Sequence, residues 1–163
     1  MKNPGSLTIT TPSDREIAMA RVFDAPRHLV WEAYTKPELL KRWLGVQGGW
    51  SLVVCEIDLR VGGSYRYLWR RGDTEMAMGG VYREVVPPER IVATELFDQP
   101  WYPGGAVGTV ELTERDGQTT LTMTIRYDSR ETRDAVLTSP MDKGVAESFE
   151  KLAELLPSMT RRA

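Results

Sequence analysis

Side chains capable of nucleophilic chemistry are sparse in this sequence. The chain has a single histidine, His28, and a single cysteine, Cys55. Nucleophilic catalysis needs a nucleophile beside a base, usually a histidine, and neither residue has such a partner at an informative spacing. Cys55 follows the apolar run Leu52-Val53-Val54, where a small buried hydrophobic residue is the expected role. We predict no catalytic site on either residue, and we expect His28 on the surface or at a helix cap.

Metal and phosphate sites also lack their usual residues. One histidine and one cysteine cannot form a usual zinc site. The glycine pairs Gly62-Gly63 and Gly104-Gly105 lack the helix and the lysine that follow a phosphate-binding loop. We therefore predict no bound metal and no cofactor.

Carboxylates are the remaining candidates for acid–base chemistry. Glu56 and Asp58 lie two residues apart in a predicted strand, so both side chains point to one face. Inside a dry cavity such a pair would share a proton and shift its pKa values. On the outer face it would pair with Arg60 or Arg66, which is the interpretation we favour. Because alternation alone does not reveal which face of a strand is inside, the same ambiguity applies to Glu84, Glu95 and Glu111.

The middle of the chain is typical of consecutive strands. Residues 64–71 alternate clearly, with Tyr65, Tyr67 and Trp69 on one face. Asp116-Gly117 separates two alternating segments and is the strongest hairpin signal in the chain. Further strands are predicted over residues 7–23, with a turn at 11–14, and over 51–59, 76–86, 91–97, 107–114 and 119–127.

Helical spacing occurs on both sides of these strands. Two short helices are predicted after the first strand, one behind the candidate N-cap Asp24 and one near Pro37. A long C-terminal helix is predicted from apolar residues at three- and four-residue steps, with Pro140 expected to kink or split it and Pro157 to end it. Hairpins followed by a helix predict an antiparallel sheet that is covered on one face.

Composition restricts the class of protein. The 163 residues fit one domain, 1–163. A net charge of −2 argues against a nucleic-acid-binding surface. The chain shows no signal peptide and no apolar stretch long enough for a membrane span. With one cysteine, it is expected in the cytoplasm.

Three blocks of sequence resemble one known family, in that family's order. They read RVFDAPRHLVWEAYTKPELLKRWLG at residues 21–45, DLRVGGSYR at 58–66 and MDKGVAESFEKL at 141–152. The chain resembles proteins similar to the activator of the ninety-kilodalton heat-shock chaperone ATPase, a branch of the SRPBCC superfamily. That superfamily also contains START lipid-transfer domains, polyketide cyclases and the birch-pollen allergen.

The resemblance implies an α+β helix-grip fold with an internal cavity. A curved antiparallel sheet of six to seven strands would wrap around the long C-terminal helix, with the two short helices closing one end. The space between sheet and helix is commonly hydrophobic in such proteins. Position 145 is often tryptophan in relatives, so Val145 would leave more room in the cavity.

Aromatic and methionine side chains supply the candidate cavity residues, because they line adaptable apolar pockets. Plain core packing is the alternative for each of them. Phe149 and Met141 are expected to meet sheet aromatics such as Tyr67, and the loop at residues 99–105 is either a lid or a rigid turn. The candidate residues are Trp43, Tyr67, Trp69, Met78, Tyr82, Trp101, Met123, Met141, Val145 and Phe149.

Three functions are compatible with these features. We favour reversible binding of a hydrophobic small molecule or lipid, with any protein partner secondary. A cyclase or hydrolase acting on a polyketide-like or aromatic substrate would need an acid or tyrosine in the cavity with a perturbed pKa. A stress-related co-chaperone module is disfavoured, because the eukaryotic co-chaperone adds a separate N-terminal domain for which this chain has no room. Homodimerisation through a sheet edge is compatible with each function.

Overall fold

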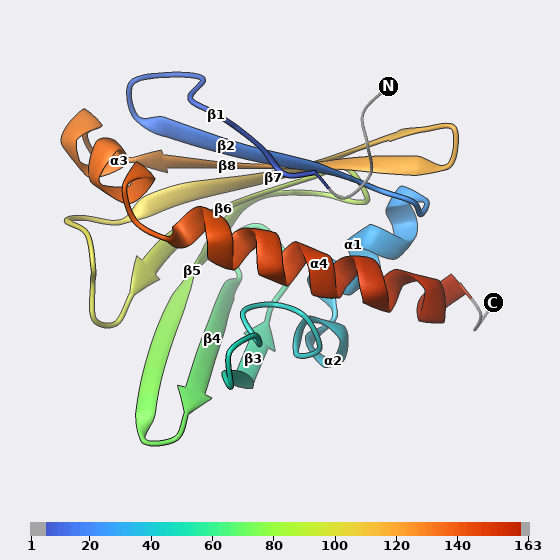
Figure 1. Ribbon diagram of the computed structural model, residues 1–163, viewed down its shortest axis with the longest axis horizontal. Helices are drawn as coiled ribbons and strands as arrows, with labels where there is room; N and C mark the ends of the chain where they lie inside the picture. Colours follow the sequence, from blue (N-terminus) through green and yellow to red (C-terminus); the bar gives the residue numbers. More distant parts are fainter. Residues whose placement is uncertain (1–5, 161–163) are drawn as a thin grey trace.

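The computed structural model describes residues 6–160, in which eight strands and four helices follow one another (Figure 1). The ends of the predicted domain, residues 1–5 and 161–163, lie outside the described residues. Within the described part, no helix is both long and apolar enough to cross a bilayer. The elements are β1 (Thr8–Thr10), β2 (Glu16–Phe23), α1 (Arg27–Thr35), α2 (Pro37–Leu40), β3 (Ser51–Ile57), β4 (Ser64–Arg71), β5 (Thr74–Val86), β6 (Arg90–Phe97), β7 (Ala106–Arg115), β8 (Gln118–Tyr127), α3 (Arg130–Leu137) and α4 (Met141–Thr160).

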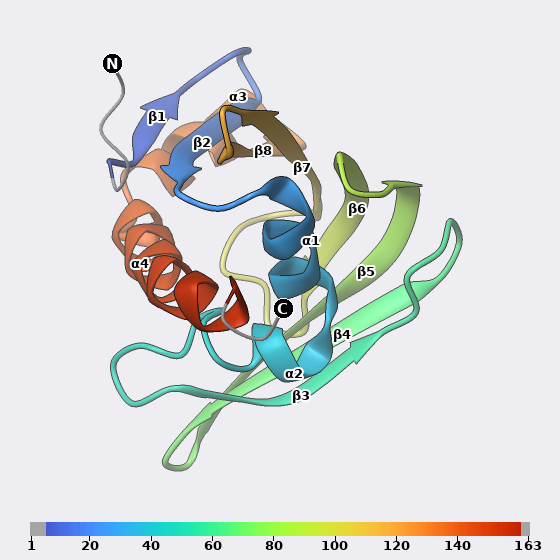
Figure 2. The same cartoon turned by 90° about the vertical axis from the view of Figure 1, so that its right-hand side faces the viewer.

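The strands form one antiparallel sheet in the order β1-β2-β8-β7-β6-β5-β4-β3. Its concave face curves around α4 and α1, as Figure 2 shows end-on. This arrangement confirms the predicted helix-grip fold. The sheet has eight strands rather than six or seven, because the turn at residues 11–14 folds the start of the chain back as β1 on the edge of β2.

Two bulges sharpen the bend of the sheet. The β3–β4 register shifts between Leu52 and Val54, and the β5–β6 register shifts between Tyr82 and Glu84. An extra residue in one strand of a pair increases local twist and reverses the inward and outward alternation beyond it. As a result Tyr82 is buried while Glu84 is exposed.

The C-terminal helical region is divided as expected at Pro140. Ser129 caps α3 by accepting a hydrogen bond of 3.1 Å from the Thr132 amide. The prediction that Pro157 ends the last helix is wrong, because α4 continues to Thr160. Leu156 and Met159 are buried on either side of Pro157, and their packing stabilises the last turn although the proline cannot donate a backbone hydrogen bond. The expected cap at Asp24 is also wrong, since α1 begins after Pro26 without a side-chain cap.

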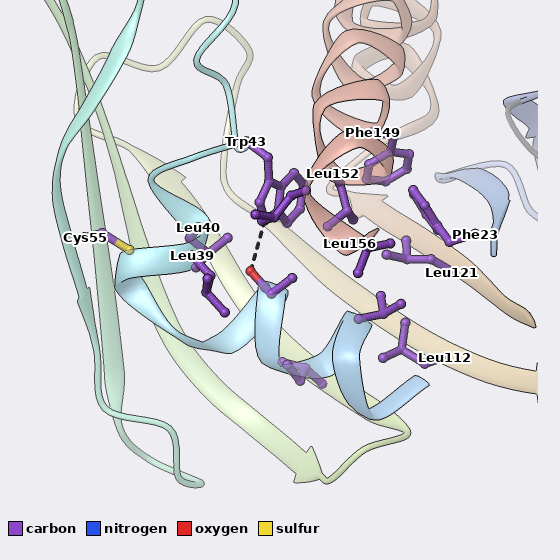
Figure 3. Close-up of a cluster of buried hydrophobic side chains, with 14 of the residues drawn as sticks. Phe23, Leu39, Leu40, Trp43, Cys55, Leu112, Leu121, Phe149, Leu152 and Leu156 are labelled. Atoms are coloured by element: carbon purple, nitrogen blue, oxygen red, sulfur yellow. Dashed lines mark hydrogen bonds between the residues drawn. The ribbon is translucent and has the colours of Figure 1, made fainter. Parts of the chain in front are cut away.

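From Phe149 onward, α4 packs into a filled core (Figure 3). The Phe149 ring lies 5.8 Å from the Phe23 ring and 6.3 Å from the Trp43 ring, measured between centroids. The Trp43 indole N–H donates to the Ala33 carbonyl over 3.0 Å, the dashed line in Figure 3. Leu152 is fully buried in the same cluster. Among the described residues, the space within the grip lies beside the part of α4 that precedes Phe149.

Candidate functional site

A cavity of about 250 Å³ lies between the concave face of the sheet and the first two turns of α4. Met141 and Val145 are the residues that α4 contributes. The walls are mainly aromatic, aliphatic and methionine side chains, the usual lining of a site for an apolar ligand. The lining residues are Tyr34, Leu44, Tyr65, Tyr67, Trp69, Met76, Met78, Tyr82, Ile91, Ala93, Glu95, Phe97, Trp101, Tyr102, Gly108, Val110, Met123, Ile125, Tyr127, Met141 and Val145.

Strand alternation places one row of aromatic rings on β4. Tyr65, Tyr67 and Trp69 point inward from alternate positions and are all buried. Their ring centroids are 5.0 Å apart for the first pair and 5.7 Å for the second. The row continues onto β5, because the Tyr82 ring lies 5.5 Å from that of Tyr65. These contacts give the cavity a wall of mutually supported rings.

A glycine joins the row of rings to α4. The Gly45 amide donates to Ser148 Oγ on α4 over 3.0 Å, and the Trp69 indole N–H donates to the Leu44 carbonyl over 2.9 Å. Gly45 has a φ of 69°, and a Cβ there would lie 2.5 Å from Trp69 Nε1. Only glycine satisfies both the left-handed conformation and the close approach. The loop after α2 thus holds the helix and the wall at a fixed spacing.

The connection between β6 and β7 closes the other side of the cavity. Trp101 and Tyr102 pack their rings 4.9 Å apart, and Tyr102 lies 5.2 Å from Tyr127 on β8. Trp101 is 46% exposed and Met76 is 41% exposed, whereas Tyr102 is buried. Trp101 and Met76 therefore form the rim, and both also line a neighbouring hollow of about 500 Å³.

Glu95 is the only acid among the described residues that line the cavity. It lies on β6 two residues after Ala93, on the inward face, and its carboxyl has no hydrogen-bond or ion-pair partner among residues 6–160. Its oxygens are nevertheless not sealed by protein atoms, so they border the cavity. Burial raises the pKa of Glu95 to about 7, because removal from water disfavours the charged form.

Tyrosines from four segments line the same cavity as this carboxyl. Burial first, and then the Glu95 charge, raises the pKa values of Tyr34, Tyr65 and Tyr102. Burial likewise raises the pKa of Tyr127, with smaller contributions from Tyr102 and Glu95. The phenols are therefore neutral at physiological pH. Tyr65 donates its hydroxyl proton to the Thr94 carbonyl over 2.7 Å, which orients that ring beside the acid.

The other candidate acids lie on the outside of the sheet. Asp58 pairs with Arg60 at 2.9 Å, and Glu56 is exposed opposite Arg66. Arg90 binds both remaining candidates, with distances of 3.3 Å to Glu84 and 2.8 Å to Glu111. Of the carboxylates considered from sequence, only Glu95 can act on a molecule inside the cavity.

His28 and Cys55 are separated from the cavity lining. His28 is exposed on α1, and Cys55 is buried in β3. Burial raises the pKa of the Cys55 thiol to about 11, so the nucleophilic thiolate is scarce at neutral pH. Among residues 6–160 no group of three His, Cys, Asp or Glu side chains is placed to hold a metal ion.

Most of the candidate cavity residues come together around the cavity. Trp43 and Phe149 do not, because they pack against each other in the filled core. Phe149 meets Phe23 and Trp43 rather than Tyr67, Trp69 or Tyr82, and the Met141 sulfur lies 4.0 Å from the Tyr127 hydroxyl. The candidates that line the cavity are Tyr67, Trp69, Met78, Tyr82, Trp101, Met123, Met141 and Val145.

The cavity residues predicted from the sequence did not include Glu95. They also did not include the four tyrosines Tyr34, Tyr65, Tyr102 and Tyr127. Glu95 follows Ile91 and Ala93 at steps of two, a pattern that indicates one shared face. Tyr65 shares a face with Tyr67 in the same way. Tyr102 lies in a loop, where no periodicity marks its direction.

The fold and the sequence match known proteins. Residues 24–157 match the family model described as Activator of Hsp90 ATPase homolog 1-like protein. A crystal structure of a Rhodobacter sphaeroides protein superposes with a TM-score of 0.88 at 29% identity, covering 94% of this chain and 99% of that chain. A Nitrosomonas europaea protein gives a TM-score of 0.80 at 25% identity, covering 91% and 98%.

More distant similarity concerns the fold alone. CalU16 from Micromonospora echinospora superposes with a TM-score of 0.62 at 22% identity, covering 96% of this chain and 87% of that chain. No curated protein sequence matches the chain at a significant level.

Proposed function

The chain belongs to the Activator of Hsp90 ATPase homolog 1-like family within the SRPBCC superfamily, and we propose that it reversibly binds a hydrophobic small molecule in its internal cavity. The observation that carries the proposal is the unfilled space beside Met141 and Val145, while the rest of the grip is packed. A solid core would have placed a larger side chain there, since protein interiors are close-packed.

The expected affinity follows from the apolar surface that a ligand would bury. At about 25 cal/mol per Å², a ligand burying roughly 250 Å² gains on the order of 6 kcal/mol before the costs of association. Dissociation constants between about a micromolar and a millimolar are therefore expected. Binding in this range suits a carrier or sensor in the cytoplasm, with any protein partner secondary.

A titration with the neutral aromatic probe naphthylmethanol tests the proposal. The wild-type protein should bind about one molecule, with its affinity read from tryptophan fluorescence and calorimetry. Val145→Trp should weaken binding at least tenfold, because the indole occupies part of the cavity. Glu147→Trp adds the same group to an exposed position of α4 and should leave the affinity unchanged. Absence of saturable binding by a folded wild-type protein would refute the proposed function.

Glu95 supports a second candidate function, acid–base catalysis on a bound aromatic or polyketide-like substrate. A carboxyl with a pKa of about 7 is suited to proton transfer at neutral pH. The test is deuterium exchange at the methyl group of acetonaphthone, where the Glu95 carboxylate would take a proton from carbon and return a deuteron from solvent. Catalysis predicts exchange that the wild type accelerates and Glu95→Gln does not; equal rates with both proteins exclude this role.

A further inference from the structure

We propose that the cavity selects ligands in which an apolar body carries a basic nitrogen, with the Glu95 carboxylate as the counter-ion and the surrounding tyrosine rings as the remainder of the nitrogen site. The inference rests on the proposed function and specifies the chemistry of its ligand. It depends on the charges that line the cavity, on the unpaired state of Glu95 and on the neutral rings around it.

The charged groups among the described residues that line the cavity are acidic, with no basic side chain beside them. Glu95 is its only carboxyl, and no lysine, arginine or histidine is among the described residues that line the space. An anionic amphiphile such as a fatty acid would place a second negative charge near Glu95 without a compensating cation. An ammonium group would instead neutralise a charge that is already partly removed from water.

Arginines are available nearby but only on the outer face. Asp98 lies three residues after Glu95 and forms a two-point pair with Arg66, whose Nη1 is 2.8 Å from Oδ1. Arg90 on the same strand binds Glu84 and Glu111 outside. Asp98, Glu84 and Glu111 therefore each form an ion pair with an arginine of this chain. Glu95 forms no ion pair among the described residues. A ligand cation is the partner that its environment lacks.

The Glu95 carboxyl occupies a space that exists because the adjacent strand has a glycine at residue 108. Gly108 on β7 lies beside it, and a Cβ at that position would overlap Oε2 of Glu95. The missing side chain gives the carboxyl its place against the strand. Glycine at residue 108 therefore leaves the space that the carboxyl occupies at the cavity wall.

The tyrosine rings that line the cavity with Glu95 are suited to binding a cation. Two pairs of rings line the cavity with Glu95: Tyr65 and Tyr82 lie 5.5 Å apart, and Tyr102 and Tyr127 lie 5.2 Å apart. The faces of aromatic rings attract a cation, and the attraction is strongest where the site is desolvated. Because the phenols stay protonated, they add no negative charge of their own, and the net charge of the nitrogen site is that of Glu95.

The pH range of the selection follows from the groups that face Glu95. These are Tyr34 from α1, Tyr65 from β4, Tyr102 from the loop and Tyr127 from β8, all with raised pKa values. Only Glu95 itself titrates near neutrality, with a pKa of about 7. The preference of the cavity for a cationic over a neutral ligand should therefore be complete above pH 7. Below pH 7 this ratio of affinities should fall about tenfold per pH unit.

Three matched probes test the inference: naphthylmethylamine, naphthylmethanol and naphthoate. At pH 8 the amine should bind wild-type protein at least tenfold more tightly than the alcohol, and naphthoate should bind most weakly. Glu95→Gln should abolish the preference for the amine. Glu111→Gln removes the same charge from the outer face and should retain it.

The outcomes separate this inference from the proposed function. Equal binding of amine and alcohol by the wild type would overturn the inference and leave the cavity function standing, whereas no binding of any probe would overturn both. Retention of the preference in Glu95→Gln would also overturn it. If that variant does not fold, the wild-type pH titration decides: a preference that persists unchanged from pH 8 to pH 5 contradicts the role of Glu95.

Discussion

The carboxyl of Glu95 lies against Gly108 on the adjacent strand so closely that a methyl group at residue 108 would overlap Oε2. The two residues face the cavity from β6 and β7. A partly buried acid without a cation is costly, and a side chain at residue 108 would occupy the space of its carboxyl. Both features fit an acid that serves a ligand better than they fit one that serves the fold.

Replacing Gly108 by alanine should displace the acid. Because the overlap is with the end of a flexible side chain, we expect the carboxyl to shift at a cost of up to about 1 kcal/mol in the free energy of unfolding, together with a weaker preference for the amine probe. Urea denaturation measures the first effect and the probe titrations measure the second.

A double-mutant cycle provides the control for that substitution. In a Glu95→Ala background the overlap is gone, so Gly108→Ala should cost much less. Gly144→Ala on α4 meets only an ordinary contact of 3.8 Å with Gln47 and should stabilise the helix by about 0.5–1 kcal/mol. An equal cost of Gly108→Ala in both backgrounds would contradict the proposed contact.

The raised pKa of Glu95 predicts a distinct dependence of stability on pH. Between its ordinary value of 4.5 and about 7, the folded state holds a proton that the unfolded state has released, so stability falls as pH rises. The full loss, present above pH 7, is on the order of 3 kcal/mol. Glu95→Gln lacks this titration, and its stability relative to the wild type should rise through that range and then level off.

Urea denaturation of both proteins from pH 4 to pH 8 checks this expectation. Glu111→Gln, which alters an exposed acid paired with Arg90, should show no such rise relative to the wild type. A constant difference between Glu95→Gln and the wild type across the range would mean that Glu95 ionises as it does in water.

The buried indole of Trp43 should matter for stability. In Trp43→Phe the Ala33 carbonyl loses its 3.0 Å donor, at a cost of about 1–3 kcal/mol for an unpaired buried group, and indole packing is lost in addition. Trp101→Phe alters a residue that is 46% exposed and should cost much less. Thermal and urea unfolding compare the two, and equal costs would contradict the assignment of Trp43 to the core.

The strands and their succession along the chain could be predicted from the sequence because alternation and turn residues act locally, whereas the pairing of β2 with β8 could not. The hairpin at Asp116-Gly117 joins β7 to β8, as predicted. Alternation fails where a strand bulges: Tyr82 and Glu84 have the same parity, yet the bulge between them turns Glu84 outward to Arg90. No signal in the residue types marks that extra residue.

The candidate site was only partly accessible for a different reason. Phe149 and Val145 lie one helical turn apart on α4, and both are apolar, but one is packed by Trp43 while the other borders empty space. Whether an apolar side chain meets another one or a void depends on the facing elements. Glu95 shows the same limit, because its inward direction required the three-dimensional position of β6.

A crystal structure of the protein soaked with naphthylmethanol shows directly whether a ligand enters the grip. We expect electron density for one molecule between Val145 of α4 and the rings of Tyr65 and Tyr82, with its hydroxyl toward Glu95. Density confined to the outer surface, or to the hollow beside Trp50 and Leu68, would contradict a ligand cavity between sheet and helix.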